Sequence, residues 1–307
     1  MIAPAPAGRP HAGAERAAVL AMVAATLIWG GTFVILRDTV PRVRPLALVF
    51  TRFLIAAVVF AAVQLARRRR VAPRGTWLGG GLSGLCAAGA YLFQAIGLTT
   101  TRAGSSAFLT CFGTVLGAFF AWPLLGQRPT GALLWGLAAA ITGAALITLH
   151  QGLALGAGEL WTLLGAALFG LQVVVLARVA PSGDAVAIGA VQAAAVALVL
   201  LPWAPAALRD LAGLGAADLA RLAYLALPAT VVAPWLQIRA QRTLPAGRIA
   251  LLFVLEPLFA LVFALSFGAE RFAWRWWLGA LLIVSGVLIV EGRTLAPASR
   301  AARRASV

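Results

Sequence analysis

The feature that most limits how this chain can fold is a series of long stretches without a charged residue, separated mostly by arginines. These stretches are 17–36, 53–66, 75–101, 103–127, 129–158, 160–177, 185–208, 222–238, 257–269 and 276–290. A membrane-spanning helix needs about 20 mostly apolar residues. The chain is 62% hydrophobic and 11% charged, whereas soluble domains are roughly 45–50% apolar and about 25% charged. The pattern predicts an all-α polytopic membrane protein and excludes a soluble fold.

Ten transmembrane helices follow from these stretches. The three shortest reach spanning length only if Arg52, Glu256 and Arg275 lie within or at the edge of the membrane. The expected helices are 18–36, 45–66, 76–98, 104–126, 131–150, 158–177, 185–205, 222–240, 246–268 and 274–291. The loops between them are too short for a separate domain, so we expect the function to lie inside the bilayer.

The basic residues indicate topology. All 25 are arginine, and the net charge is +16. They fall between apolar stretches instead of along one face, which argues against nucleic-acid binding. With the N-terminus in the cytoplasm, 15 arginines lie on the cytoplasmic side and 8 on the other. The positive-inside rule therefore predicts that both tails, 1–16 and 293–307, are cytoplasmic. The arginine-only, alanine-rich composition suggests a bacterial genome rich in G and C, and we expect the protein in the bacterial cytoplasmic (inner) membrane.

Enzyme chemistry has little support in the sequence. Cys86 and Cys111 lie inside apolar stretches, His11 lies in the N-terminal tail and His150 ends a predicted helix. No CxxC or HExxH spacing is present, so we expect no metal site, no cofactor and no catalytic activity.

An internal repeat relates the two halves of the chain. At an offset of 143 residues, 94–143 aligns with 237–286 without a gap, and Gly136 aligns with Gly279 and Gly143 with Gly286. The third predicted helix then corresponds to the eighth, five helices later. Because five is odd, the two halves must insert in opposite orientations, which is typical of secondary transporters. Chance similarity among alanine, glycine and leucine is the alternative.

Short motifs in the same order add a family resemblance. They are Ile28–Phe33 (IWGGTF), Thr51–Leu54 (TRFL), Gly158–Leu160 (GEL), Leu255–Leu258 (LEPL) and Glu270-Arg271. Together the motifs resemble the EamA branch of the drug/metabolite transporter superfamily, with two inverted five-helix repeats at 17–150 and 158–292. The resemblance implies export or exchange of small metabolites, such as amino acids or drug-like compounds, without ATP. A proton or another coupling ion and a homodimer are compatible with it.

Two other functions remain open at this point. A carrier (flippase) for lipid-linked substrates would need an arginine-lined opening toward the lipid. A membrane scaffold that transports nothing would need extramembrane surface, of which this chain has little.

Glu256 is the acidic residue that the sequence places deepest in the membrane, about eleven residues into its helix. Charged groups at this depth are costly and often functional, so Glu256 is a candidate for proton coupling. Pro257 has no N–H for the helical ladder and is expected to loosen the helix there. The alternative is a structural role in which Glu256 stays protonated, or pairs with Arg52 or with a backbone group, and only holds helices together.

Other polar residues within the helices are candidates for substrate binding. Arg52 lies about 10 Å inside its helix, where it would attract an anionic group or else snorkel to the outer interface. The glutamines would bind a zwitterion or else join helices by hydrogen bonds. These glutamines are Gln94, Gln172, Gln192 and Gln237. The repeat relates Gln94 to Gln237, so we expect the two to approach each other.

Aromatic residues and glycines complete the candidate set. Trp29, Tyr91 and Trp235 lie within predicted helices and would form the walls of a binding site, or else simply pack. Gly30 and Gly31 are candidate bending points, with close helix packing as the alternative. We expect the prolines Pro228 and Pro234 to loosen the eighth helix.

Overall fold

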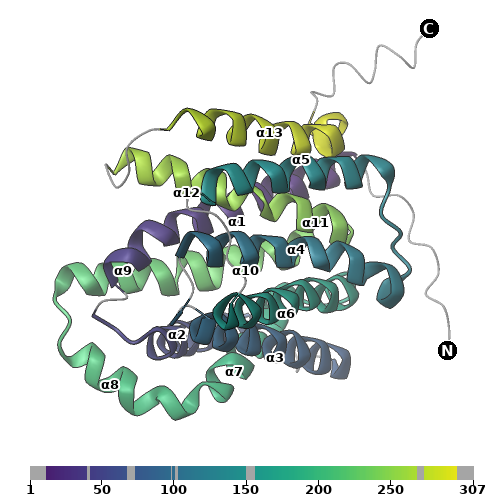
Figure 1. Ribbon diagram of the computed structural model, residues 1–307. Coiled ribbons are helices and arrows are strands. Elements are labelled where there is room, and N and C mark those ends of the chain that lie inside the picture. Colours follow the sequence, from purple (N-terminus) through teal and green to yellow (C-terminus); the bar gives the residue numbers. More distant parts are fainter. Residues whose placement is uncertain are drawn as a thin grey trace, which may run out of the picture.

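Figure 1 shows a computed structural model of the chain, which describes residues 12–39, 42–67, 73–97, 99–100, 103–149, 156–267 and 273–295. Within these residues every regular element is helical, and the helices run side by side in a bundle (Figure 1). The outer parts of the predicted tails, 1–11 and 296–307, lie outside the described residues.

The first half forms five long helices close to the predicted positions. They are α1 (Ala12–Thr39), α2 (Pro45–Ala66), α3 (Arg74–Gly97), α4 (Ala103–Leu125) and α5 (Gly131–Thr148). Only α1 differs markedly from its expected range, because it is longer at both ends. Its first turn contains Glu15, and an acidic residue there is stabilised by the helix dipole.

The second half also makes five passages, but three of them are interrupted. The first and last are continuous and consist of α6 (Ala157–Val179) and α13 (Trp274–Leu295). The interrupted passages are α7 (Ala185–Val199), η1 (Leu201–Trp203) and α8 (Ala204–Ala212); α9 (Ala216–Ala226), η2 (Pro228–Val232) and α10 (Ala233–Ala240); and α11 (Ala246–Phe253) and α12 (Leu255–Ser266). The prediction of one uninterrupted helix for each of these three passages is therefore wrong.

Each interruption lies beside a proline. Pro202 belongs to η1, where the chain bends by 60° between α7 and α8. Pro228 begins η2, which is a π-helical turn. Pro257 cannot donate to the carbonyl of Phe253, and the helix breaks at Val254, between α11 and α12. The loosening predicted at Pro228 and Pro257 is thus observed.

The passages have the dimensions of membrane spans. Among the described residues, eight helices are long and apolar enough to cross a bilayer, and α7 with α8 makes a ninth if the bent pair counts as one. The α3 helix has 24 residues, which makes it about 36 Å long, and glycines and polar residues lower its hydropathy. These passages agree with the ten predicted transmembrane helices.

The contacts between the two halves come in equivalent pairs. Helices α3 and α4 of the first half pack against α6 of the second half. In the same way, α10 and the α11–α12 passage of the second half pack against α1 of the first half. Corresponding passages also meet, because α2 packs on α7, α4 on α11, and α5 on α13 (Figure 1). Two halves related by an approximate two-fold axis produce this pattern, as the inverted repeat predicts.

Repeat-related glycines lie at one of these contacts, between α5 and α13. A Cβ atom on Gly136 would lie 2.7 Å from the carbonyl oxygen of Gly286, and one on Gly279 would lie 2.7 Å from that of Gly143. Because the repeat aligns Gly136 with Gly279 and Gly143 with Gly286, these are the same contact made once from each half. Chance similarity of composition does not explain this correspondence.

A methyl group at this contact should destabilise the protein. We expect Gly279→Ala to lower the free energy of unfolding by about 1–3 kcal/mol, because the neighbouring backbone must move. Thermal unfolding of the purified protein in detergent measures the loss. Gly81→Ala in α3 is the control, since no heavy atom lies within 4 Å of the added Cβ. Equal melting temperatures for the two variants would contradict the close packing.

Candidate functional site

An irregular turn, η2, lies where the two halves meet. In a π-helical ladder each carbonyl accepts from the N–H five residues later, as Pro228 does from Ala233. The carbonyl of Ala229 would then need an N–H from residue 234, which is proline. The indole N–H of Trp29 in α1 donates to this carbonyl instead, at 2.9 Å. Trp29 thereby joins the first half to the irregular backbone of the second.

Arg52 in α2 also binds this turn. It is 5% exposed, and its Nε donates to Oγ1 of Thr230 at 3.0 Å. The Thr230 hydroxyl in turn donates to the carbonyl of Leu225 at 2.7 Å. This burial contradicts the alternative that Arg52 snorkels to the interface. Within the described part of the chain no carboxylate forms an ion pair with Arg52.

Tyr91 in α3 lies near two opposite charges that come from different halves. It is within electrostatic range of Arg52 and of Glu256 in α12. Its ring makes edge contacts with Phe53, at 5.5 Å between centroids, and with Phe169, at 5.1 Å. Arg52, Tyr91 and Glu256 together form what we call the central cluster, which has an aromatic wall.

Glu256 lies in the first turn of α12, directly after the break at Val254. Its side chain is partly buried, and the described residues give its carboxyl group no hydrogen bond and no ion pair. The predicted alternative of a pair with Arg52 is therefore not observed. Within the same residues, no three His, Cys, Asp or Glu side chains are grouped as metal ligands would be.

Two of the predicted glutamines join helices. Gln94 donates through Nε2 to Oγ1 of Thr110 at 2.8 Å, which links α3 to α4. Gln192 accepts at 3.1 Å from the hydroxyl of Ser83, which links α7 to α3. These bonds favour the structural alternative for both residues.

The other two glutamines differ from each other. Gln237 donates to Gln241 at 3.3 Å, and Gln241 donates to the carbonyl of Val173 at 2.7 Å, which links α10 to α6. No hydrogen bond in the described structure connects Gln237 to Gln94, although the repeat relates them. Gln172 is buried and makes no hydrogen bond to another described residue, so it stays a candidate for ligand contact.

Gly30 and Gly31 allow α1 to approach the second half closely. A Cβ on Gly30 would lie 2.9 Å from the backbone nitrogen of Ala260, and one on Gly31 would lie 2.6 Å from the hydroxyl oxygen of Tyr224. That hydroxyl donates to the carbonyl of Ile28 at 2.9 Å. These contacts favour close packing over bending.

Two predicted tryptophans extend the aromatic surroundings of the central cluster. The ring of Trp29 stacks on Phe253 at the end of α11, with 5.2 Å between centroids. Trp235 in α10 belongs to the same hydrophobic cluster as Tyr91 and Phe53. The guanidinium of Arg239 lies 5.0 Å from its ring centroid.

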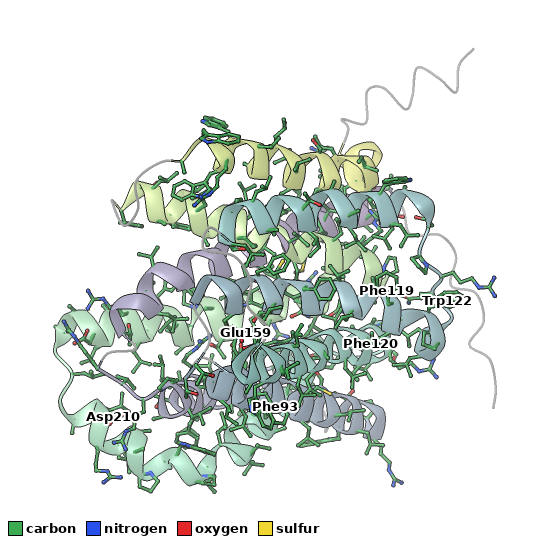
Figure 2. The ribbon with its side chains drawn as sticks, in the orientation of Figure 1. Phe93, Phe119, Phe120, Trp122, Glu159 and Asp210 are labelled. Carbon is green, nitrogen blue, oxygen red and sulfur yellow. The ribbon has the colours of Figure 1, made fainter. Side chains whose placement is uncertain are left out.

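The described ion pairs lie at the ends of the helices, away from the central cluster. Beside the start of α2, Arg42 binds Asp218 at 2.6 Å and Arg44 binds Asp210 at 2.8 Å. Both pairs connect the two halves. Figure 2 shows Asp210 on α8 at one end of the bundle and Trp122 on α4 at the other.

A second charged cluster lies at the opposite end. Arg248 at the start of α11 donates to Glu15 at 2.8 Å, to both carboxylate oxygens of Glu291, and to Thr294 at 3.1 Å. Glu291 is 0% exposed. Because Glu15 begins α1 and Glu291 ends α13, both ends of the described chain lie on the same side of the bundle.

Sequence reasoning did not select Thr230 or Arg248. The sequence could have marked Thr230 as a candidate, because it is a hydroxyl residue between Pro228 and Pro234 in an apolar passage. It could also have marked Arg248, which is a charged residue just inside the predicted helix 246–268. The partners of both residues are distant in sequence, and this is the part that no local pattern reveals.

Loss of one partner from the Arg248 cluster should be costly. We expect Glu291→Gln to lower the free energy of unfolding by about 3 kcal/mol, because a largely buried guanidinium loses its bidentate carboxylate. Thermal unfolding in detergent measures the effect. Arg44→Gln is the control, since that side chain is 55% exposed and exposed pairs contribute little. A melting temperature as insensitive to Glu291→Gln as to the control would contradict the assignment.

Nearly the whole chain is similar to known proteins. Residues 16–149 and 156–291 each match the profile of the EamA-like transporter family. An uncharacterized transporter of Archaeoglobus fulgidus is 26% identical over 275 residues, covering 89% of this chain and 85% of that protein. A solved crystal structure of a protein with 18% identity has a TM-score of 0.74 and covers 89% of this chain and 97% of its own. That structural likeness shows the fold alone.

Proposed function

Because the chain belongs to the EamA-like transporter family, we propose that it exports or exchanges small amphipathic metabolites, amino acids or drug-like compounds, by secondary transport. The family makes it a multi-pass membrane transporter and not an enzyme. The proposal adds the mechanism, the substrate class and the location. The location is the bacterial cytoplasmic membrane, with both termini in the cytoplasm.

The observation that supports this mechanism is the packing of the two halves around an approximate two-fold axis, with the central cluster between them. Each half is an inverted copy of the other, so exchanging their conformations would open the site first to one side and then to the other. Arg52 belongs to the first half, and Glu256 and Thr230 belong to the second. A substrate bound among them would contact both halves and would respond to their relative motion.

The ion pairs at the two ends would act as closures in such a cycle. The pairs of Arg42 and Arg44 join the halves at the α8–α9 end, and Arg248 joins them at the other. Opening to one side requires the pairs on that side to separate. Arg42 and Arg44 are more than half exposed, and exposed pairs are weak, so their separation costs little.

Glu256 is the group that we propose for proton coupling. Its carboxyl group has no partner among the described residues, and it follows a helix break, where the backbone is least constrained. A carboxyl group in a medium of low dielectric is costly to ionise without a partner. Binding and release of a proton would therefore accompany its exposure to either side.

Transport in proteoliposomes tests the proposal. Protein reconstituted with unlabelled L-phenylalanine inside should exchange it for radiolabelled L-phenylalanine outside, and an imposed pH gradient should raise uptake several-fold. Glu256→Gln should keep the exchange and lose the response to the gradient, because the amide cannot bind a proton in this range. Exchange measured at a series of equal internal and external pH values gives the same comparison without a gradient.

Glu159→Gln is the matched control for this test. Glu159 accepts from the backbone N–H of Gly156 at the start of α6, and a glutamine there can still accept through its side-chain carbonyl. Its pH response should equal that of the unsubstituted protein. An unchanged pH response in Glu256→Gln removes Glu256 from the coupling role, and the absence of any exchange across a panel of amino acids and drug-like compounds contradicts transport.

A further inference from the structure

Arg52 has more hydrogen-bond donors than the described residues occupy. A guanidinium group carries five N–H donors, and the described structure gives this one a single acceptor, Oγ1 of Thr230 at Nε. The terminal nitrogens Nη1 and Nη2 have no acceptor among the described residues. The side chain is 5% exposed.

Thr230 fixes the direction of this guanidinium group. Its hydroxyl hydrogen is used toward the carbonyl of Leu225, at 2.7 Å, so toward Arg52 its oxygen can only accept. The π-helical turn holds Thr230 in place, and the carbonyl of Ala229 in the same turn is held by Trp29. Anchoring at Nε leaves the two terminal nitrogens as a planar fork.

The counter-charge for Arg52 does not come from the described residues. Their ion pairs lie at the ends of the helices. The acid of the central cluster, Glu256, forms no ion pair with Arg52. A buried charge without a partner is costly and is retained mainly where it serves a function. An anionic ligand would supply the partner that the described residues do not give Arg52.

We propose that Arg52 binds the carboxylate group of the transported molecule and that Thr230 is its positioning residue. A planar fork of N–H donors fits a carboxylate through two parallel hydrogen bonds. The neighbouring rings of Phe53, Tyr91 and Phe169 suit an apolar or aromatic body. The substrate class is thus small amphipathic carboxylic acids, amino acids included. This inference rests on the proposed transport function and specifies what its site recognises.

Three probes that share one aromatic body separate the charges involved. Phenylacetate carries only a carboxylate, phenethylamine only an ammonium, and L-phenylalanine carries both. Ligand-induced shifts in the melting temperature of the purified protein report binding, because a ligand of the folded state raises stability. Exchange in proteoliposomes is measured in parallel with the same three compounds and with inorganic phosphate.

We expect phenylacetate and L-phenylalanine to stabilise the protein and phenethylamine not to do so. Arg52→Gln should weaken binding of both carboxylates at least 10-fold, and Arg52→Lys should weaken it less. Thr230→Val should weaken it while Thr230→Ser, which keeps the hydroxyl, restores it. A purely structural role for Thr230 would instead change the melting temperature without ligand and leave the ligand-induced shift intact. Arg74→Gln, at the exposed start of α3, should bind all probes as the unsubstituted protein does.

Several results would overturn the inference. They are stabilisation by phenethylamine or phosphate alone, equal binding of carboxylates by Arg52→Gln, and no response to either carboxylate at millimolar concentration. Transport of phenethylamine that is insensitive to Arg52→Gln would leave the proposed transport function standing and remove only the carboxylate site. Absence of transport for every compound, with carboxylate binding intact, would contradict the proposed transport function and leave the carboxylate site standing.

Discussion

Hydrocarbon offers no water to replace a lost backbone hydrogen bond, so every irregular stretch within the membrane needs a partner from the protein itself. The indole of Trp29 supplies that partner for the carbonyl of Ala229, and the hydroxyl of Thr230 supplies one for Leu225. The first bond crosses from α1 to η2, that is, from one half of the protein to the other. Loss of the contact with α1 would leave the carbonyl of Ala229 without this partner. This links the conformation of the turn, and with it the position of Arg52, to the relative placement of the halves.

The two halves correspond passage by passage, yet they are not equivalent. In the first half α3 and α4 are continuous helices, whereas their counterparts in the second half are interrupted at η2 and at Val254. Glu256 occupies the position that the repeat aligns with Gly113 in α4, which packs against the backbone of Ala166. The acid, the prolines and the irregular turn thus belong to the second half, and the first half contributes the buried cation.

Much of the fold was predictable, because in a membrane both helix length and apolar composition are set by the bilayer. The repeat aligned Gly136 and Gly143 with Gly279 and Gly286, but their contact was not predicted, whereas the prolines predicted where passages would loosen. The corner at Pro202 was missed, since the apolar stretch continues through it. Individual site residues were harder to predict, because the partner of Arg52 is Thr230, 178 positions away in the sequence. The apolar pattern shows depth in the membrane but not which faces of the helices meet.

Accessibility of the central cluster from each side of the membrane tests the account most directly. In a protein with Cys86 and Cys111 replaced by serine, Tyr91→Cys would carry a single thiol among the residues that separate Arg52 from Glu256. A membrane-impermeant thiol reagent is applied to right-side-out and, separately, to inside-out vesicles. The account predicts modification from both sides, and a change in the ratio of the two rates when phenylacetate is added. Modification from one side only, with no response to ligand, would contradict a site that opens to the two compartments in turn.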